Sequence, residues 1–461
     1  MRESCGLFGI FSPKPDPKIS RTVYYGLIAL QHRGQESAGI AVGDGEKIKY
    51  HKGLGLVNDV FNEEVLGELS GHVAIGHVRY STTGSNVFEN AQPIVVAGQQ
   101  GSLAVAHNGN IINTRELRSQ LEKKGLSFRS TTDSEIIALL LIEQGPDMLH
   151  ACLDVTRTLQ GAYCLLLMNQ NSLIAIRDPL GFRPLCMGRL DDCVVFASET
   201  VALDAVGAEF VRDIEPGEVV LVNESGVESH RTAFSRSAFC IFEFVYFARP
   251  DSVLENVSVY STRERAGRIL AIQQPADADL VVGVPDSGTV AAIGYSNQSG
   301  IPYGMGLIKN KYIGRTFIQP SQKLRNLGVR LKLNALRELV KGKSIVLVDD
   351  SIVRGTTMGQ IVKMLRTAGA RSIHVRIASP PIRYGCYFGV DTSDRRELIA
   401  AIHEEKKIEQ LIGADSLGYL SLEGLVKAVG LPSDRLCLAC FNGIYPLQVP
   451  SFCTKYLFEK E

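Results

Sequence analysis

SIVLVDDSIVRGTT, at residues 344–357, is the stretch that decides the fold of the second half of this chain. It begins as a β-branched apolar strand, and that strand ends in two adjacent carboxylates, Asp349 and Asp350. The chain then turns through Arg354 and Gly355 into a helical pattern. Free backbone N–H groups at a helix N-terminus favour a phosphate group, and glycine lets the backbone approach it closely. The stretch therefore predicts a phosphate-binding loop beyond the carboxyl end of a buried strand.

Apolar strands alternate with helices on both sides of this loop. Near-continuous apolar runs predict strands at residues 280–284, 344–348 and 374–378, and helical patterns lie at residues 331–340 and 359–368. Such alternation is typical of a parallel sheet that is covered by helices on both faces. The second half is therefore expected to be an α/β domain.

A second loop, VVGVPDSG at residues 281–288, also joins a strand to a tight polar turn. Carboxylates are the preferred protein ligands of hydrated magnesium, so Asp349 and Asp350 could hold this ion as well as ribose hydroxyls. Two aspartates could instead merely cap a helix after an ordinary turn, but the complete string is far more specific than the Asp-Asp pair alone. Together the two loops resemble those of type I phosphoribosyltransferases.

That resemblance implies a site for phosphoribosyl pyrophosphate and Mg²⁺. It assigns to the site the residues Asp286, Ser287, Asp349, Asp350, Ser351, Arg354, Gly355, Thr356 and Thr357, with Ser287, Asp349 and Asp350 near the magnesium ion. A basic segment at residues 309–330 shows little periodicity and is either a loop over the site or a disordered connection. Its Lys309, Lys311 and Arg315 could close over the pyrophosphate as a lid, although each alone could be a solvated surface charge.

The first half shows a different pattern of short strands and helices. Alternating or apolar runs predict strands at residues 73–78, 103–107, 162–168 and 193–197, and helical patterns lie at 22–32, 114–124 and 134–144. The polar, serine-containing stretch 223–237 is expected to be a connection. We therefore expect a first domain of strands packed under helices at residues 5–230 and a second domain at residues 231–461, preceded by a short propeptide, residues 1–4.

CGLFGIF, at residues 5–11, places a thiol directly before a glycine and an apolar strand. An internal cysteine has no neighbouring base in the sequence. If residues 1–4 are removed, Cys5 gains its own α-amino group, whose reference pKa of about 7.7–8.0 lies just below the cysteine value of about 8.5. That amine can take the thiol proton, which would make Cys5 a nucleophile. The alternative is a small apolar residue at the start of a strand.

Four further motifs favour the nucleophile, namely ALQHRGQESAGIA (29–41), GHVRYSTTG (76–84), AHNGNI (106–111) and TTDSE (131–135). They resemble, in this order, the motifs of class II glutamine amidotransferases. The resemblance implies an N-terminal-nucleophile glutaminase domain with αββα layers. It also implies that Arg79 binds the α-carboxylate of glutamine, that Asp133 pairs with its ammonium group, and that the Asn108 side chain and the Gly109 N–H form the oxyanion hole. Arg33 would support the same pocket.

The two halves together resemble the glutamine phosphoribosyl pyrophosphate amidotransferase family, as do DPLGFRPL (178–185) and IEPGEVV (214–220). The resemblance implies that ammonia from glutamine passes internally to phosphoribosyl pyrophosphate, giving phosphoribosylamine in the first committed step of purine synthesis. It also implies a homo-tetramer and allosteric inhibition by purine nucleotides. A class II amidotransferase acting on a sugar phosphate or aspartate would lack VLVDDSIVRGTT, and a protein that only senses phosphoribosyl pyrophosphate would not need a glutaminase.

Four cysteines remain in a pattern of one close pair and two remote thiols: Cys240, Cys386, Cys437 and Cys440. This spacing alone is compatible with zinc, with an iron–sulfur cluster or with no metal. One branch of the family carries a 4Fe-4S cluster on cysteines in these contexts. Because this sequence has all four, the resemblance implies the cluster here.

The composition limits the partners and the compartment. The 461 residues require at least two cores, and the 49 basic and 49 acidic residues leave no net field that would attract nucleic acid or an anionic membrane. No apolar stretch is long enough to cross a bilayer, and we see no secretory leader. We therefore expect a cytoplasmic protein whose 10 cysteines are reduced.

Overall fold

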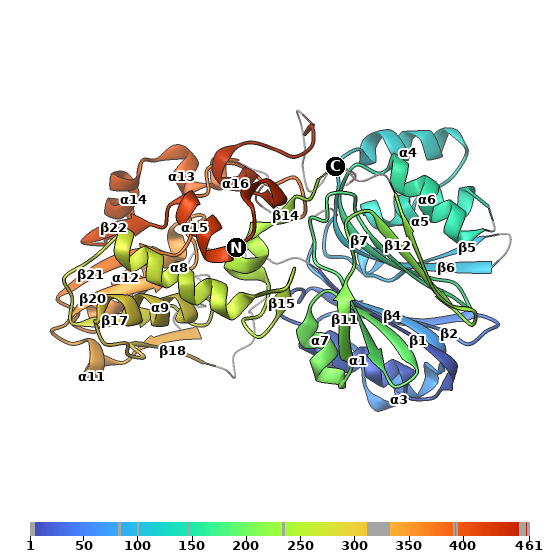
Figure 1. The fold of residues 1–461 in the computed structure, drawn as a ribbon, viewed down its shortest axis with the longest axis horizontal. Coiled ribbons are helices and arrows are strands. Elements are labelled where there is room, and N and C mark those ends of the chain that lie inside the picture. Colours follow the sequence, from blue (N-terminus) through green and yellow to red (C-terminus); the bar gives the residue numbers. More distant parts are fainter. Residues whose placement is uncertain are drawn as a thin grey trace.

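The computed structural model describes residues 5–81, 84–98, 101–145, 147–232, 236–310, 332–390, 392, 395–450 and 458. These residues form two domains that lie side by side (Figure 1). The first contains two antiparallel sheets, and the second contains a parallel sheet. Both predictions of fold class are therefore confirmed.

The first domain stacks two sheets between two layers of helices. The seven-stranded sheet contains, in spatial order, β11 (Glu209–Asp213), β9 (Cys186–Leu190), β10 (Cys193–Ala197), β1 (Gly6–Asp16), β4 (Gly71–Arg79), β2 (Ser37–Gly43) and β3 (Ile48–Leu54). The six-stranded sheet contains β13 (Gly226–Arg231), β12 (Glu218–Asn223), β8 (Leu173–Arg177), β7 (Gly161–Met168), β6 (Gly101–Ile111) and β5 (Ile94–Gly98).

The period-two alternation of β1 explains this layering. Leu7 and Phe11 point into the core between the two sheets, whereas Phe8 and Ile10 point to the opposite face, which helices cover. The helices on that face are α1 (Ile19–Ala29), α2 (Val57–Val60), α3 (Glu63–Glu68) and α7 (Thr200–Val206). The outer face of the six-stranded sheet is covered by α4 (Thr114–Lys123), α5 (Asp133–Glu143) and α6 (Met148–Thr158).

The second domain is built on four parallel strands, β17 (Leu280–Gly283), β20 (Ser344–Asp349), β21 (Ser372–Ile377) and β22 (Ser416–Tyr419). Along β20, Val346 and Val348 face one core while Ile345 and Leu347 face the other, so the strand is apolar throughout. The first core is covered by α8 (Val259–Gln273), α9 (Thr289–Ser299) and α15 (Leu422–Val429), and the second by α12 (Thr356–Thr367) and α14 (Glu405–Ile412).

Shorter elements connect and cover these layers. They are β14 (Phe239–Cys240), the π-helix η2 (Glu243–Phe247), β15 (Val253–Leu254), β16 (Val257–Ser258), β18 (Leu307–Lys309), β19 (Leu333–Ala335), α11 (Arg337–Val340), α13 (Ile399–Ile402), β23 (Leu436–Cys437) and α16 (Ala439–Asn442), with 3₁₀ turns at Phe88–Asn90, Arg395–Glu397 and Ser433–Arg435. The β14 and β23 strands pair in parallel, with Cys240 opposite Cys437. Two remote cysteines of the sequence thus become neighbours.

Two sequence predictions were wrong in detail. The helix expected at residues 331–340 is interrupted, because Leu333–Ala335 forms β19 against β18 and Arg337–Val340 forms a separate short helix. The available edge of β18 overrides a weak helical pattern. The stretch 223–237, expected to be a connection, contains β13, a largely exposed edge strand that pairs with β12. Its polar composition suits the solvent-facing edge of a sheet.

Candidate functional site

Cys5 lies buried immediately before β1, beside the end of β4. Its Sγ atom donates to the Tyr80 carbonyl oxygen at 3.2 Å, and the Tyr80 N–H lies 3.4 Å from the same sulfur. Burial raises the pKa of the thiol to about 11, an effect that the Tyr80 backbone and the charge of Arg79 lower only in part. An internal Cys5 is therefore a thiol at neutral pH and needs a base before it can attack a substrate.

Two charged side chains with sequence-predicted roles lie near this thiol. Arg79, at the end of β4, is 2% exposed and donates to the carbonyl oxygens of Gly84 and Ser85 at 3.3 and 3.2 Å. Asp133 begins α5 and accepts from the Ile111 N–H at 3.1 Å. Burial opposes its ionisation, but the nearby His107 ring and this N–H bring the pKa of Asp133 below its usual value. A buried cation and a buried anion thus stand near Cys5.

Asn108 and Gly109 lie on β6, in the neighbouring sheet. The Asn108 side chain is fully buried, and neither its Nδ2 nor its Oδ1 has a hydrogen-bond partner among the described residues. Such an amide is costly unless something else binds it, so it is a candidate ligand contact. Gly109 has φ +152°, and a Cβ there would lie 2.0 Å from the Ala162 carbonyl oxygen on β7, so only glycine fits.

The side chain of Arg33 contacts the backbone of Cys5. Its Nε donates to the Cys5 carbonyl oxygen at 2.9 Å, while its Nη atoms pair with Glu199 at 2.6 Å and with Glu243 at 2.9 Å. All three side chains are fully buried. Arg33 therefore supports the backbone of Cys5, and its predicted part in binding glutamine stays a prediction.

The second candidate site is a pocket of about 480 Å³ beyond the carboxyl ends of β17 and β20. This volume falls within the usual range for small-molecule sites, about 300–1,000 Å³. Eight of the nine residues assigned to phosphoribosyl pyrophosphate line it, namely Ser287, Asp349, Asp350, Ser351, Arg354, Gly355, Thr356 and Thr357. The helix α12 begins at Thr356 after Gly355, whose φ of +75° directs the chain into it. The predicted strand, loop and helix are thus present.

The two carboxylates of this pocket are adjacent and buried. Burial, and then the charge of Asp350, raise the pKa of Asp349 well above its usual value. A cation bound beside the pair would relieve this repulsion, so the donor set fits Mg²⁺. Among the described residues no group of three or more His, Cys, Asp or Glu side chains could hold a metal ion. A magnesium ion here would thus keep several waters or substrate oxygens as ligands, as it commonly does.

Two of the cations assigned to phosphate binding form ion pairs with acidic side chains. Lys309, on β18, forms an ion pair with Asp286, which does not line the pocket, and Arg354 pairs with Glu397. Both pairs are solvent-exposed, so they exchange readily for a phosphate partner. Lys311 and Arg315 lie outside the described residues, as do residues 1–4.

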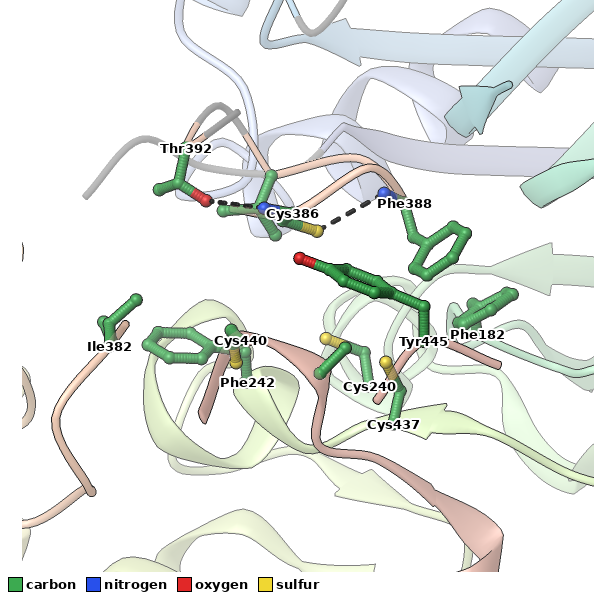
Figure 2. Close-up of a pocket in the computed structure, with 12 residues that line it drawn as sticks. Phe182, Cys240, Phe242, Ile382, Cys386, Phe388, Thr392, Cys437, Cys440 and Tyr445 are labelled. Carbon is green, nitrogen blue, oxygen red and sulfur yellow. Dashed lines mark hydrogen bonds between the residues drawn. The ribbon is translucent and has the colours of Figure 1, made fainter. Parts of the chain in front are cut away.

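The four remaining cysteines come together. Cys240, Cys386, Cys437 and Cys440 line one largely apolar pocket, in which the ring of Tyr445 lies between Cys386 and the other thiols (Figure 2). They are free thiols, and the Phe388 N–H lies 3.3 Å from the Cys386 sulfur. In a four-iron cluster each thiolate binds a different iron, so the sulfurs stand farther apart than around a single ion. Four cysteine thiols around one pocket are the donor set of a 4Fe-4S cluster and also of a structural zinc ion.

Sequence reasoning missed the acidic partners of the buried arginines. Glu36 lies 4.0 Å from Arg79 and accepts from the Ser81 N–H, while Glu199 and Glu243 hold Arg33. Glu36 belongs to a quoted motif, but Glu199 and Glu243 lie 166 and 210 residues from Arg33. No spacing rule could have joined them.

Comparisons with known proteins match both halves of the chain. Residues 77–205 match a glutamine amidotransferase domain, and residues 265–379 match a phosphoribosyl transferase domain. Amidophosphoribosyltransferases are 52% identical in Mycobacterium tuberculosis (97% of this chain, 87% of the relative), 51% in Methanocaldococcus jannaschii (96% and 98%) and 49% in Bacillus subtilis (97% and 95%).

A solved structure is similar along nearly the whole chain. It is the Bacillus subtilis glutamine phosphoribosylpyrophosphate amidotransferase complexed with ADP and GMP, with a TM-score of 0.91, 48% identity and coverage of 97% of this chain and 98% of that one. Within the described residues, no helix has the length and apolar character that a membrane span requires.

Proposed function

Because the chain belongs to the amidophosphoribosyltransferase family, we propose that Cys5 and the Asp349–Asp350 pair serve the two halves of that family's reaction. The enzyme hydrolyses glutamine to glutamate and transfers the ammonia to C1 of phosphoribosyl pyrophosphate, which gives phosphoribosylamine and diphosphate. This is the first committed step of purine synthesis.

The buried amide of Asn108, which has no hydrogen-bond partner among the described residues, is the observation that carries the first half of the proposal. Glutamine binds with its α-carboxylate on Arg79 and its ammonium group on Asp133. The α-amine of a processed Cys5 accepts the thiol proton, and the sulfur attacks the side-chain carbonyl carbon. Asn108 Nδ2 and the Gly109 N–H then stabilise the oxyanion. The protonated amine gives its proton to the leaving nitrogen, ammonia departs, and water cleaves the resulting thioester to release glutamate and the free thiol.

The loop before α12 carries the second half. Its backbone N–H groups and the hydroxyls of Thr356 and Thr357 bind the ribose 5-phosphate, while Asp349 and Asp350 hold the ribose hydroxyls. The same carboxylates, with Ser287, would hold Mg²⁺, which when bound neutralises charge on the leaving diphosphate. Ammonia forms a bond to C1 as the bond from C1 to diphosphate breaks. Lys309, Lys311 and Arg315 cover the diphosphate and exclude water.

The four-cysteine pocket would hold a 4Fe-4S cluster on Cys240, Cys386, Cys437 and Cys440, once the Tyr445 ring leaves its position between the thiols. The cluster would cross-link β14, β23, α16 and the loop that carries Cys386, which makes it a structural element. Protein purified without air should contain about four irons per chain. Cys437→Ala should lose that iron, and Cys193→Ala, a half-buried cysteine outside the pocket, should keep it. A wild-type protein that contains no iron after purification without air would contradict the proposal of a cluster.

We further propose inhibition by purine nucleotides, a cytoplasmic homo-tetramer and removal of residues 1–4. The nucleotide proposal rests on the ADP and GMP in the Bacillus subtilis structure. Sedimentation with and without these nucleotides tests the assembly, and the mass of the purified chain tests the processing.

A pair of variants tests the two-site reaction. Cys5→Ala should lose phosphoribosylamine formation from glutamine but keep formation from added ammonia, because only the first site is altered. Asp350→Asn should lose both, while its hydrolysis of glutamine persists. Glutamine-dependent synthesis by Cys5→Ala would contradict the proposal, as would equal loss of both activities in that variant.

A further inference from the structure

Four fully buried charges meet at the interface of the two domains. Arg33 and Arg183 come from the first domain, and both contact Glu243, the first residue of η2 in the second domain. Glu243 Oε1 accepts from Arg33 Nη2 at 2.9 Å and from Arg183 Nη1 at 2.9 Å. Glu199 completes the group through its 2.6 Å contact with Arg33, so the two positive and two negative charges balance.

This group reaches the nucleophile at one end. Arg33 Nε donates to the carbonyl oxygen of Cys5 at 2.9 Å, so the guanidinium is held between the Cys5 backbone and two carboxylates. Burial lowers the pKa of Arg33, but the charges of Glu243 and Glu199 outweigh it and hold that pKa above the usual range. Arg33 is therefore a permanent cation whose position depends on both partners.

At the other end the group is fixed to the second domain. Arg183 Nη2 donates to the Phe388 carbonyl oxygen at 2.8 Å, and the rings of Phe182 and Phe388 stack with centroids 4.4 Å apart. Arg183 and Phe182 belong to the motif DPLGFRPL, to which neither of the two proposed sites assigns a role. The motif joins the domains at this point.

We infer that Glu243 is a positioning residue for the glutamine half-reaction, acting through Arg33 on the backbone of Cys5. A carboxylate of the second domain thus completes the first site. This inference rests on the proposed role of Cys5 as the nucleophile. Without the Glu243 charge, the two buried guanidinium groups of Arg33 and Arg183 share the single carboxylate of Glu199, so the group becomes net positive and its arginines move toward other acceptors. The Cys5 backbone then loses its support, and misplacement of a nucleophile by about 1 Å costs on the order of 100-fold in rate.

A purely structural ion pair is the alternative, and the interface offers a matched control. Arg177 pairs with Glu255 at 2.8 Å across the same interface. The Arg177 side chain is 1% exposed and the Glu255 side chain is 10% exposed, and Glu255 also contacts Arg435. In the described part of the chain, the other hydrogen bonds and ion pairs of the Arg177 and Glu255 side chains go to Gly181, Arg183, Ile214 and Arg435, and not to Cys5 or Arg33. Glu255→Gln therefore removes a buried interdomain charge without altering the support of the nucleophile.

The test compares Glu243→Gln with Glu255→Gln in the full-length enzyme. Glu243→Gln should lower kcat for glutamine hydrolysis by about 10- to 100-fold. Its KM for glutamine and its ammonia-dependent rate should stay within about threefold of wild type, because Arg79, Asp133 and the second site are untouched. Glu255→Gln should lower the melting temperature and leave both rates unchanged.

A second measurement keeps the test informative if Glu243→Gln is unstable. Glu243→Asp retains the charge but shortens the reach, so it should show a smaller fall in kcat and slower covalent labelling of Cys5 by a glutamine analogue with a diazoketone group. Wild-type kcat and labelling in both Glu243 variants would overturn the inference, as would an equal kcat loss in Glu255→Gln. Glutamine-dependent synthesis by Cys5→Ala would instead overturn the proposed function, so the two failures are distinguishable.

Discussion

Replacement of Asn108 by alanine tests the oxyanion site in two independent ways. The variant removes the donor that we place on the developing oxyanion, and loss of one such donor costs about 2.7–4 kcal/mol, or ~10²–10³-fold in kcat. Because the amide is fully buried without a described partner, its removal also deletes two unsatisfied polar atoms. Each unsatisfied group costs about 1–3 kcal/mol, which offsets the small cavity left behind. The free energy of unfolding should therefore change by less than about 1 kcal/mol.

The assay measures glutamate release under saturating glutamine, with urea unfolding on the same samples. Asn110→Ala is the matched control on the same strand, because the Asn110 Nδ2 donates to the Tyr387 carbonyl oxygen at 2.9 Å and so has a structural use. This control should lose about 0.5–1.5 kcal/mol of stability and keep its glutaminase rate within a few-fold. An Asn108→Ala variant with a rate within threefold of wild type, or with a stability loss like that of the control, would refute the reasoning.

Three further predictions concern the second site and the response to acid. Asp350→Asn should lower phosphoribosylamine formation from ammonia by on the order of 10²-fold, measured by diphosphate release. Burial lowers the pKa of His77 to about 3, whereas an unfolded imidazole titrates near 6.5, so the unfolded state takes up its proton first. Stability should therefore fall with pH from about 6.5 toward 3, by up to about 1.4 kcal/mol per unit, and His77→Gln should flatten this slope in urea unfolding. Burial opposes the ionisation of Glu199, but His32 and Arg33 hold its pKa below the usual value, so its stabilisation should fade as pH drops below about 4.3, and Glu199→Gln should lack that part of the acid response in melting-temperature scans.

Local patterns predicted the elements that carry the sites. The strand that ends at Asp349 and the helix that begins at Thr356 follow from an apolar run, a glycine and a helical period within 14 neighbouring residues. The grouping of Asn108, Arg79 and Asp133 with Cys5 came from motif resemblance, because they lie on different sheets and a helix. Periodicity alone could not have placed them together.

The interface between the domains was beyond sequence reasoning. Glu199, Glu243 and Arg183 look like surface charges, since such residues are almost never fully buried unless paired. Their burial depends on partners up to 210 residues away. The pairing of Cys240 with Cys437 is similar, because the two short strands that carry them gain order only from each other. The helix predicted at residues 331–340 was wrong for the same reason, since the edge of β18 decides the conformation of β19.

The transfer of nitrogen within one chain is the central claim, and an isotope experiment tests it most directly. Wild-type enzyme is given phosphoribosyl pyrophosphate, glutamine labelled with ¹⁵N in the side-chain amide, and an equal concentration of unlabelled ammonia, and the product is analysed by mass spectrometry. We predict that most of the phosphoribosylamine carries ¹⁵N, and that Cys5→Ala yields only unlabelled product. A wild-type product that is largely unlabelled, and therefore formed from the ammonia in bulk solution, would contradict the account.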